Sequence, residues 1–116
     1  MILTPTFTIF LGDDKTMYLK AVNSGCNSDP LDLTSCTEID IILPNADGTF
    51  THRLLSLAQV AITSPAILGK FSAEIGSLIS ALLNVGEYQN FDVVFTIAGK
   101  VFAVRYYQGL SVFERT

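Results

Sequence analysis

Apolar and polar positions alternate along most of this chain, and a period of two residues is typical of half-buried β-strands. In residues 37–43, for example, Ile39, Ile41 and Leu43 alternate with a second set of positions, Glu38, Asp40 and Ile42. Residues 90–97 repeat the pattern. The alternation predicts strands over residues 6–10, 17–22, 37–43, 49–54, 60–62, 69–75, 90–97, 101–107 and 110–113. Roughly eight or nine short strands of this kind favour a mainly β, mostly antiparallel sandwich.

The period changes once, between the strands predicted at residues 69–75 and 90–97. An apolar stripe at helical spacing is formed by Leu78, Ile79, Leu82 and Leu83. With Ser77 as the expected N-cap and Gly86 as the expected stop, the pattern predicts one short helix over about residues 77–84. A helix of about two turns is not stable alone, so we expect it to pack on the sheets as a crossover between strands.

Turn signals separate the predicted strands. Asp47-Gly48 predicts a tight hairpin, because Gly supplies the positive φ that such a turn requires. Residues 23–34 are polar and turn-rich, which indicates a surface loop, and Gly109 is expected to break the last apolar run. No internal repeat or linker is visible, so we expect a single β-sandwich domain over residues 1–116.

Composition points to contacts with other proteins. Apolar residues make up 49% of the chain and charged residues only 16%, against a usual charged share of about 25%. Part of the apolar excess must therefore lie on the surface, where large apolar patches usually mark protein–protein contacts. The net charge is −4 and the cations are scattered, so nucleic-acid binding is not expected. No signal peptide or membrane span is recognisable, and we expect synthesis in the cytosol without membrane insertion.

Candidate chemistry is sparse. His52 is the sole histidine, no Gly-x-Ser-x-Gly elbow or phosphate-binding glycine motif occurs, and a partner-facing or solvent-facing His52 is favoured over a catalytic one. The aspartates lie at predicted turns without the spacing of a calcium loop, although a loosely bound calcium between Asp29 and Asp32 stays open. We therefore expect no enzyme activity, catalytic residue, metal, cofactor or small-molecule substrate.

The two cysteines, Cys26 and Cys36, are ten residues apart. Two free thiols are the favoured interpretation, and a disulfide remains the alternative for an oxidising compartment.

The strand predicted at residues 101–107 is apolar or aromatic on both faces. One interpretation is a central strand that is covered on both sides. The other is an interface, where Tyr, Phe and Arg are enriched, with Arg105 and Tyr106 facing a partner.

Four segments follow a common structural pattern: Pro30-Leu31-Asp32-Leu33-Thr34-Ser35-Cys36-Thr37-Glu38-Ile39, Asn45-Ala46-Asp47-Gly48, Gly69-Lys70-Phe71, and Leu82-Leu83-Asn84-Val85-Gly86-Glu87-Tyr88. The ending, Leu110-Ser111-Val112-Phe113-Glu114-Arg115, is of the same style. Together these segments, over about residues 30–115, resemble small immunoglobulin-like structural proteins of tailed bacteriophages, such as the N-terminal domains of baseplate upper proteins.

The resemblance implies an immunoglobulin-like antiparallel β-sandwich. It also implies a non-enzymatic, multicopy virion component of the tail, baseplate or neck, assembled in the cytoplasm of the host bacterium. Its partners would be copies of itself and other virion structural proteins. A capsid decoration (cement) protein is the alternative within this class. A carbohydrate-binding module is the alternative from another class, disfavoured because the chain contains no Trp.

Exposed strand edges and apolar burial would supply the affinity of such a subunit. The predicted contact residues are Thr6, Phe7, Thr8, Ile9, Phe10, Arg105, Tyr106, Leu110, Val112 and Phe113.

Overall fold

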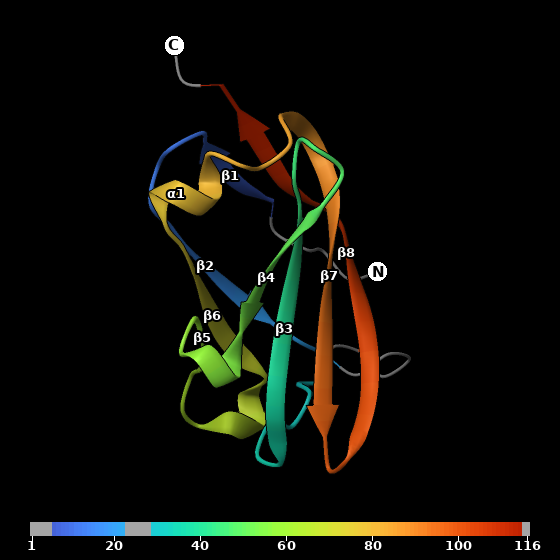
Figure 1. The fold of residues 1–116 in the computed structure, drawn as a ribbon. Coiled ribbons are helices and arrows are strands. Elements are labelled where there is room, and N and C mark those ends of the chain that lie inside the picture. The colour runs from blue at the N-terminus through green and yellow to red at the C-terminus, as the bar shows by residue number, and fades with distance from the viewer. Residues whose placement is uncertain (1–5, 23–28, 115–116) are drawn as a thin grey trace.

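The fold is a two-sheet β-sandwich, seen in a computed structural model that describes residues 6–22 and 29–114 (Figure 1). One sheet has five strands in the order β1-β8-β7-β3-β4: β1 (Phe7–Phe10), β3 (Cys36–Pro44), β4 (Phe50–Leu54), β7 (Gly86–Ile97) and β8 (Lys100–Phe113). The other has three strands in the order β2-β6-β5: β2 (Lys15–Lys20), β5 (Val60–Ile62) and β6 (Lys70–Ile75). The predicted mainly β sandwich is confirmed.

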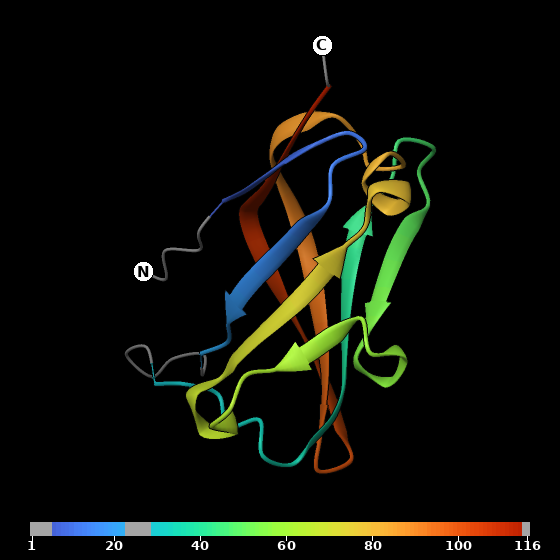
Figure 2. The same cartoon turned by 90° about the vertical axis from the view of Figure 1, so that its left-hand side faces the viewer.

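The chain passes from one sheet to the other four times, after β1, β2, β4 and β6. Figure 2 shows the smaller sheet lying across the larger one, with the connections at the two ends of the sandwich. This strand order is immunoglobulin-like. Within the described residues β1 pairs parallel to β8, and the other strand pairs are antiparallel.

Alternate side chains of both sheets fill the space between them. Ile39, Phe95 and Phe102 occupy one cross-strand row of the large sheet, and Phe71 of the small sheet meets Phe95 edge-on with ring centroids 5.6 Å apart. Phe71 and Phe95 are almost completely buried. The alternation that predicted the strands therefore also sorts side chains between the core and the outside.

The last strand is longer than the sequence pattern indicates. Gly109 was expected to break it, but β8 continues through Gly109 to Phe113, so this prediction is wrong. The glycine serves a close approach instead: a Cβ added there would lie 2.6 Å from Cε1 of the Phe91 ring. The irregularity falls one residue earlier, at Gln108 with a φ of 56°, where the β7–β8 register shifts.

The predicted helix is a single turn, α1 (Ser77–Ser80), and not residues 77–84. Its N-cap is Gly76 and not Ser77, and the Ser77 N–H donates to Oδ1 of Asp14 at 2.8 Å. The helix ends early because the segment after it pairs with the β3–β4 hairpin: the Ala46 N–H donates to the Leu82 carbonyl, and the Asn84 N–H donates to the Pro44 carbonyl. Gly86, the expected stop, is the first residue of β7.

Two 3₁₀ turns, η1 (Leu55–Leu57) and η2 (Ala66–Leu68), flank β5. Among residues 6–22 and 29–114, no helix is long and apolar enough to pass through a bilayer.

Candidate interaction surface

His52 lies on β4 with its side chain half exposed, and its Nδ1 is 2.9 Å from Oδ2 of Asp40 on β3. The pair joins two neighbouring strands across the sheet surface and becomes an ion pair when the imidazole is protonated. In the part of the chain that the structure describes, no three His, Cys, Asp or Glu side chains gather to hold a metal ion.

The turn aspartates bond to their own loops. Asp32 accepts hydrogen bonds from both the hydroxyl and the backbone N–H of Thr34, and Asp47 accepts the same two bonds from Thr49. These bonds stabilise the carboxylate form, and in each case the hydroxyl is the larger cause of a pKa held below the ordinary aspartate value. Both residues thus have the turn-forming role that the sequence favoured.

Cys36 is a partly buried thiol that donates to the Glu38 carbonyl, with Sγ 3.3 Å from the oxygen. Burial raises its pKa, which keeps the thiol protonated and unreactive. Cys26 lies outside the described residues, so the pairing of the two cysteines stays a prediction.

The predicted contact residues divide between the core and the surface. Four of them belong to the core: Ile9, Tyr106, Leu110 and Val112. β1 and β8 pair in the register that sets Ile9 beside Val112, and both side chains point between the sheets. The expectation that these four side chains face a partner is therefore corrected.

Tyr106 shows the cause of this error. Its ring stacks on Phe91 with centroids 5.0 Å apart and a tilt of 3°, and its hydroxyl donates to the Lys20 carbonyl at 3.4 Å. Burial raises the pKa of Tyr106 to about 12. A tyrosine that joins the two sheets in this way has no free face for a partner.

The other predicted contact residues are at least partly on the surface. Thr6, Thr8, Phe10 and Arg105 are exposed, while Phe7 and Phe113 are half-buried. The Phe10 and Phe113 rings lie 5.7 Å apart at the end of the β1–β8 pair.

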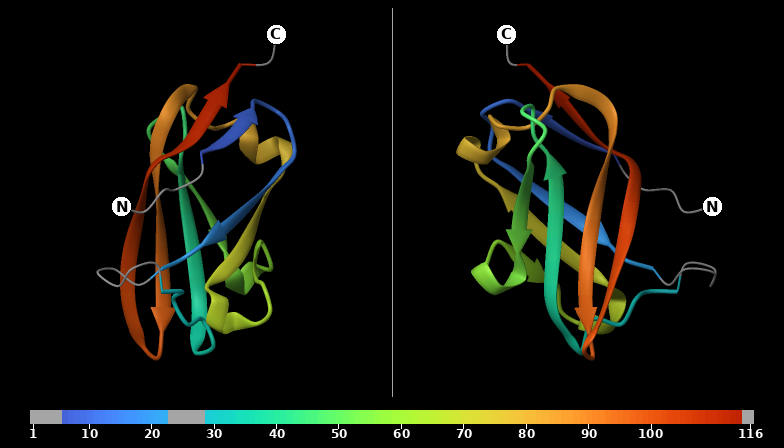
Figure 3. Two further views of the ribbon diagram at one scale, coloured as in Figure 1. Left: turned by 180° about the vertical axis from the view of Figure 1, so that it is seen from behind. Right: turned by 45° about the vertical axis from the view of Figure 1, so that its right-hand side comes forward.

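The five-stranded sheet turns one face away from the small sheet (Figure 3), and many of the side chains on this outer face are apolar. We call its outward-facing side chains the large outer face. Its apolar members are Ile42, Pro44, Phe50, Leu54, Val94, Val101, Ala103 and Tyr107. They form rows that cross the strands. One such row runs from Ala103 to Val94 and then, beyond Asp40, to Leu54.

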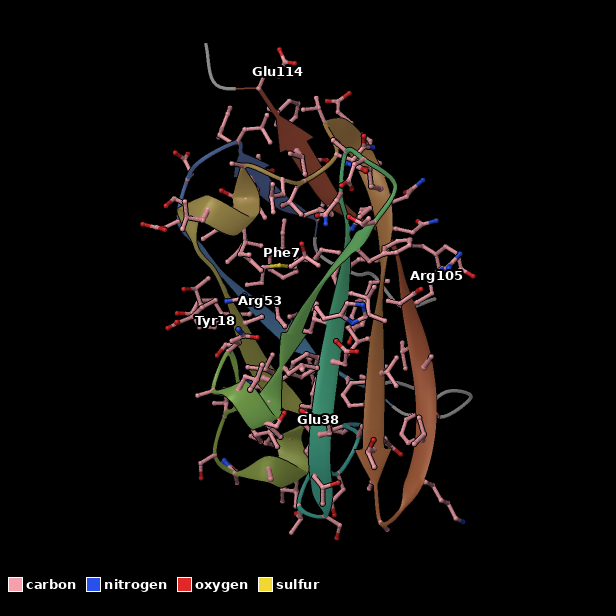
Figure 4. All side chains as sticks on the ribbon, in the orientation of Figure 1. Phe7, Tyr18, Glu38, Arg53, Arg105 and Glu114 are labelled. Atoms are coloured by element: carbon pink, nitrogen blue, oxygen red, sulfur yellow. The ribbon has the colours of Figure 1, made fainter. Side chains whose placement is uncertain are left out.

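The charged side chains of this face already have hydrogen-bond partners within the chain. Arg105 donates to Asp92 through Nε at 2.9 Å and through the terminal guanidinium nitrogen at 3.2 Å, and Figure 4 shows Arg105 projecting outward from β8. The hydrogen bond to Asp92, followed by its negative charge, raises the pKa of Arg105. Glu38 accepts the backbone N–H of Ser56 at 3.0 Å. Charges that are paired before docking lose less hydration energy when a neighbour covers them.

A second apolar group lies at the α1 end of the sandwich. Leu78 is 84% exposed, and Leu82 and Val85 are also exposed, next to a hollow of about 190 Å³ lined by Asn45, Ala46, Asp47, Ala81 and Leu82. The helical stripe in the sequence predicted that Leu78 and Leu82 pack on the sheets. Only Leu83 of that stripe is fully buried, because α1 ends after one turn and the stripe does not continue along one face.

Sequence reasoning missed most of the large outer face, including Phe50, Val101 and Tyr107. The available signal was the apolar character of both faces of β8, with Val94 on the otherwise polar face of β7.

Neither a protein-family model nor a curated protein matches the chain.

Proposed function

We propose that this chain is a non-enzymatic structural subunit that acts through protein–protein contacts. The observation that carries this proposal is the large outer face, where exposed and partly exposed apolar side chains surround the Arg105–Asp92 pair and the hydrogen-bonded His52 and Asp40. A solvated face gains nothing from such a composition. A face that a neighbour covers gains apolar burial at low desolvation cost.

We propose further that the subunit belongs to the virion of a tailed bacteriophage, as a multicopy component of the tail, baseplate or neck. The resemblance of residues 30–115 to phage immunoglobulin-like proteins supports this assignment. Its partners are copies of itself and other virion proteins, and repetition of one contact around a symmetry axis gives a small domain a strong total affinity. No nucleic acid, membrane, cofactor or substrate takes part.

Quantitative mass spectrometry of purified particles tests this proposal. The expected result is that the chain is present at a fixed, symmetric copy number of about six or twelve per particle. Tens to hundreds of copies would assign it to capsid decoration instead. A chain that is absent from particles and monomeric by light scattering would contradict both assignments.

A further inference from the structure

A hollow of about 300 Å³ opens between the edge of the large sheet and one end of the small sheet. It is lined by Asp14, Lys15, Thr16, Arg53, Glu74, Ile75 and Gly76. Its walls come from β4 on one sheet and from β2 and β6 on the other. The hollow therefore lies at one side of the sandwich, where the edge strand β4 meets the small sheet.

Arg53 enters this hollow from β4. It pairs in register with the buried Ile41, so its side chain lies on the inward-facing side of an edge strand. Its Nε donates to the backbone carbonyl of Glu74 at 3.1 Å, which fixes the guanidinium across the gap between β4 and β6 (Figure 4). With Nε held there, the terminal nitrogens remain for a ligand.

Lys15 enters the same hollow from the small sheet. It pairs in register with the buried Ile75 and lies on the same side of β2 as the buried Met17. Its side chain therefore also lies on the inward-facing side of its strand. The two cations thus come from facing sheets.

Both cations lack a carboxylate partner within the described part of the chain, since neither has a carboxylate oxygen within 4.0 Å. They are nevertheless half-buried, whereas the other described cations, Lys20, Lys70, Lys100 and Arg105, are exposed. This distribution is the reverse of what self-pairing would produce, because a half-buried cation gains more from a counter-ion than an exposed one.

The two acidic residues that line the hollow, Asp14 and Glu74, form no ion pair with Arg53 or Lys15. Asp14 accepts the Ser77 N–H through Oδ1 at 2.8 Å. Glu74 is exposed and pairs with Thr16 on the outward-facing side of the small sheet, so only its carbonyl is turned toward Arg53. Both cations therefore keep donors for an anion that enters the hollow.

We propose that this hollow is an oxyanion-binding site in which Arg53 and Lys15 hold a carboxylate or phosphate group. The guanidinium supplies a planar pair of donors that matches two oxygens of the ligand, and the ammonium supplies a compact point charge from the opposite side. The site goes beyond the proposed function and does not depend on it. The oxyanion is either the carboxylate of an acidic side chain on another polypeptide or a phosphate group.

Amide chemical shifts of the isolated chain, recorded by NMR during titration at constant ionic strength, test this assignment. One arm uses inorganic phosphate and the other uses acetate, each balanced with sodium chloride. The expected result is a saturable shift centred on Lys15, Thr16, Arg53 and Gly76. Tighter binding of acetate than of phosphate assigns the site to carboxylates, and tighter binding of phosphate, or saturation by phosphate alone, assigns it to phosphate groups.

The variants are Arg53→Gln and Lys15→Gln, with Lys100→Gln at the exposed β7–β8 hairpin as the matched loss of a cation. Glutamine at position 53 still offers a neutral donor to the Glu74 carbonyl. We expect Arg53→Gln to weaken binding by about tenfold or more, as for the loss of a charged hydrogen-bonding group, and Lys100→Gln to leave binding unchanged. Absence of a saturable shift with either anion overturns the proposal. So do saturable shifts that persist in both the Arg53 and the Lys15 variant.

Discussion

The two outer faces of the sandwich differ in the chemistry that they present. On the three-stranded sheet the outward-facing residues are mostly polar or charged: Thr16, Tyr18, Lys20, Ala61, Lys70, Ser72 and Glu74. Their charges are exposed and form no ion pair with one another, as on a surface that stays in water. On the large outer face apolar side chains predominate, Arg105 pairs with Asp92, and His52 bonds to Asp40.

Two tyrosines make this contrast measurable. Tyr18 on β2 is 71% exposed and Tyr107 on β8 is 68% exposed, so the two rings offer nearly equal area to a partner. Tyr18 lies between Lys20 and Thr16 on its strand, whereas Tyr107 lies next to the paired Arg105, on the same side of β8 as Val101 and Ala103. Exposure alone therefore does not identify a docking face, and the neighbours of each exposed ring decide.

The two sheets that carry these outer faces pack against each other through one shared core. Phe95→Ala removes the ring that meets Phe71 across the two sheets, and we expect a loss of about 3–5 kcal/mol in the free energy of unfolding. Urea denaturation followed by fluorescence and by circular dichroism measures it. The unfolding transitions recorded by the two signals should coincide and should shift to lower urea concentration together. Separate transitions would show that the sheets do not share one core.

Tyr106 and Tyr107 are neighbours on β8 that face opposite ways. Burial raises the pKa of Tyr106 to about 12, above the ordinary value of 10.0. The neutral phenol is thus the form that the fold stabilises, so this stability is complete below pH 10 and is lost as the pH rises toward 12. The loss reaches about 3 kcal/mol.

Denaturation measured at a series of pH values, for the native chain and for Tyr106→Phe, checks this expectation. The variant lacks the ionisable hydroxyl, so the part of the alkaline loss caused by Tyr106 should disappear. An unchanged slope between pH 10 and pH 12 would contradict burial of the Tyr106 hydroxyl.

Association should distinguish the matched tyrosines. Tyr107→Ala should weaken binding to the neighbouring subunit by about thirtyfold, which corresponds to about 2 kcal/mol for an aromatic contact in an interface. Tyr18→Ala is the control and should leave binding unchanged. Light scattering over a dilution series, or surface binding to the isolated partner, measures both. Equal losses for the two variants would remove the distinction between the faces.

The smallest effect concerns the ionic groups of the large outer face. Arg105→Gln should change the unfolding midpoint of the isolated chain only slightly, because the pair with Asp92 is exposed to solvent. The change should vanish at about 1 M salt, where screening removes surface ion-pair interactions. A large shift that is insensitive to salt would indicate that Arg105 has a structural role in the isolated chain.

The sequence predicted the strands well because a period of two residues has a direct physical cause, the alternation of side chains across a sheet. It could not choose the buried side of β8, since Val104 and Tyr106 alternate with Ala103 and Tyr107 and both sets are apolar. The choice came from long-range pairing, which sets Tyr106 opposite the buried Phe91 and Val104 opposite the buried Val93.

Two other features also depended on distant contacts. The helix beginning at Ser77 is short because the chain after it bonds to Pro44 and Ala46, which a local pattern of leucines does not reveal. Arg53 occupies an inward-facing position of β4, where the alternation rule predicts an apolar residue. The hollow beside it arises from the meeting of two sheets, so no stretch of sequence contains its signal.

Oxidative footprinting of Tyr107 and Tyr18 in the assembled particle and in the isolated chain tests the central claim most directly. If a neighbour covers the large outer face, modification of Tyr107 falls several-fold on assembly while modification of Tyr18 stays the same. Equal modification of Tyr107 in both states, or protection of Tyr18 alone, would contradict it.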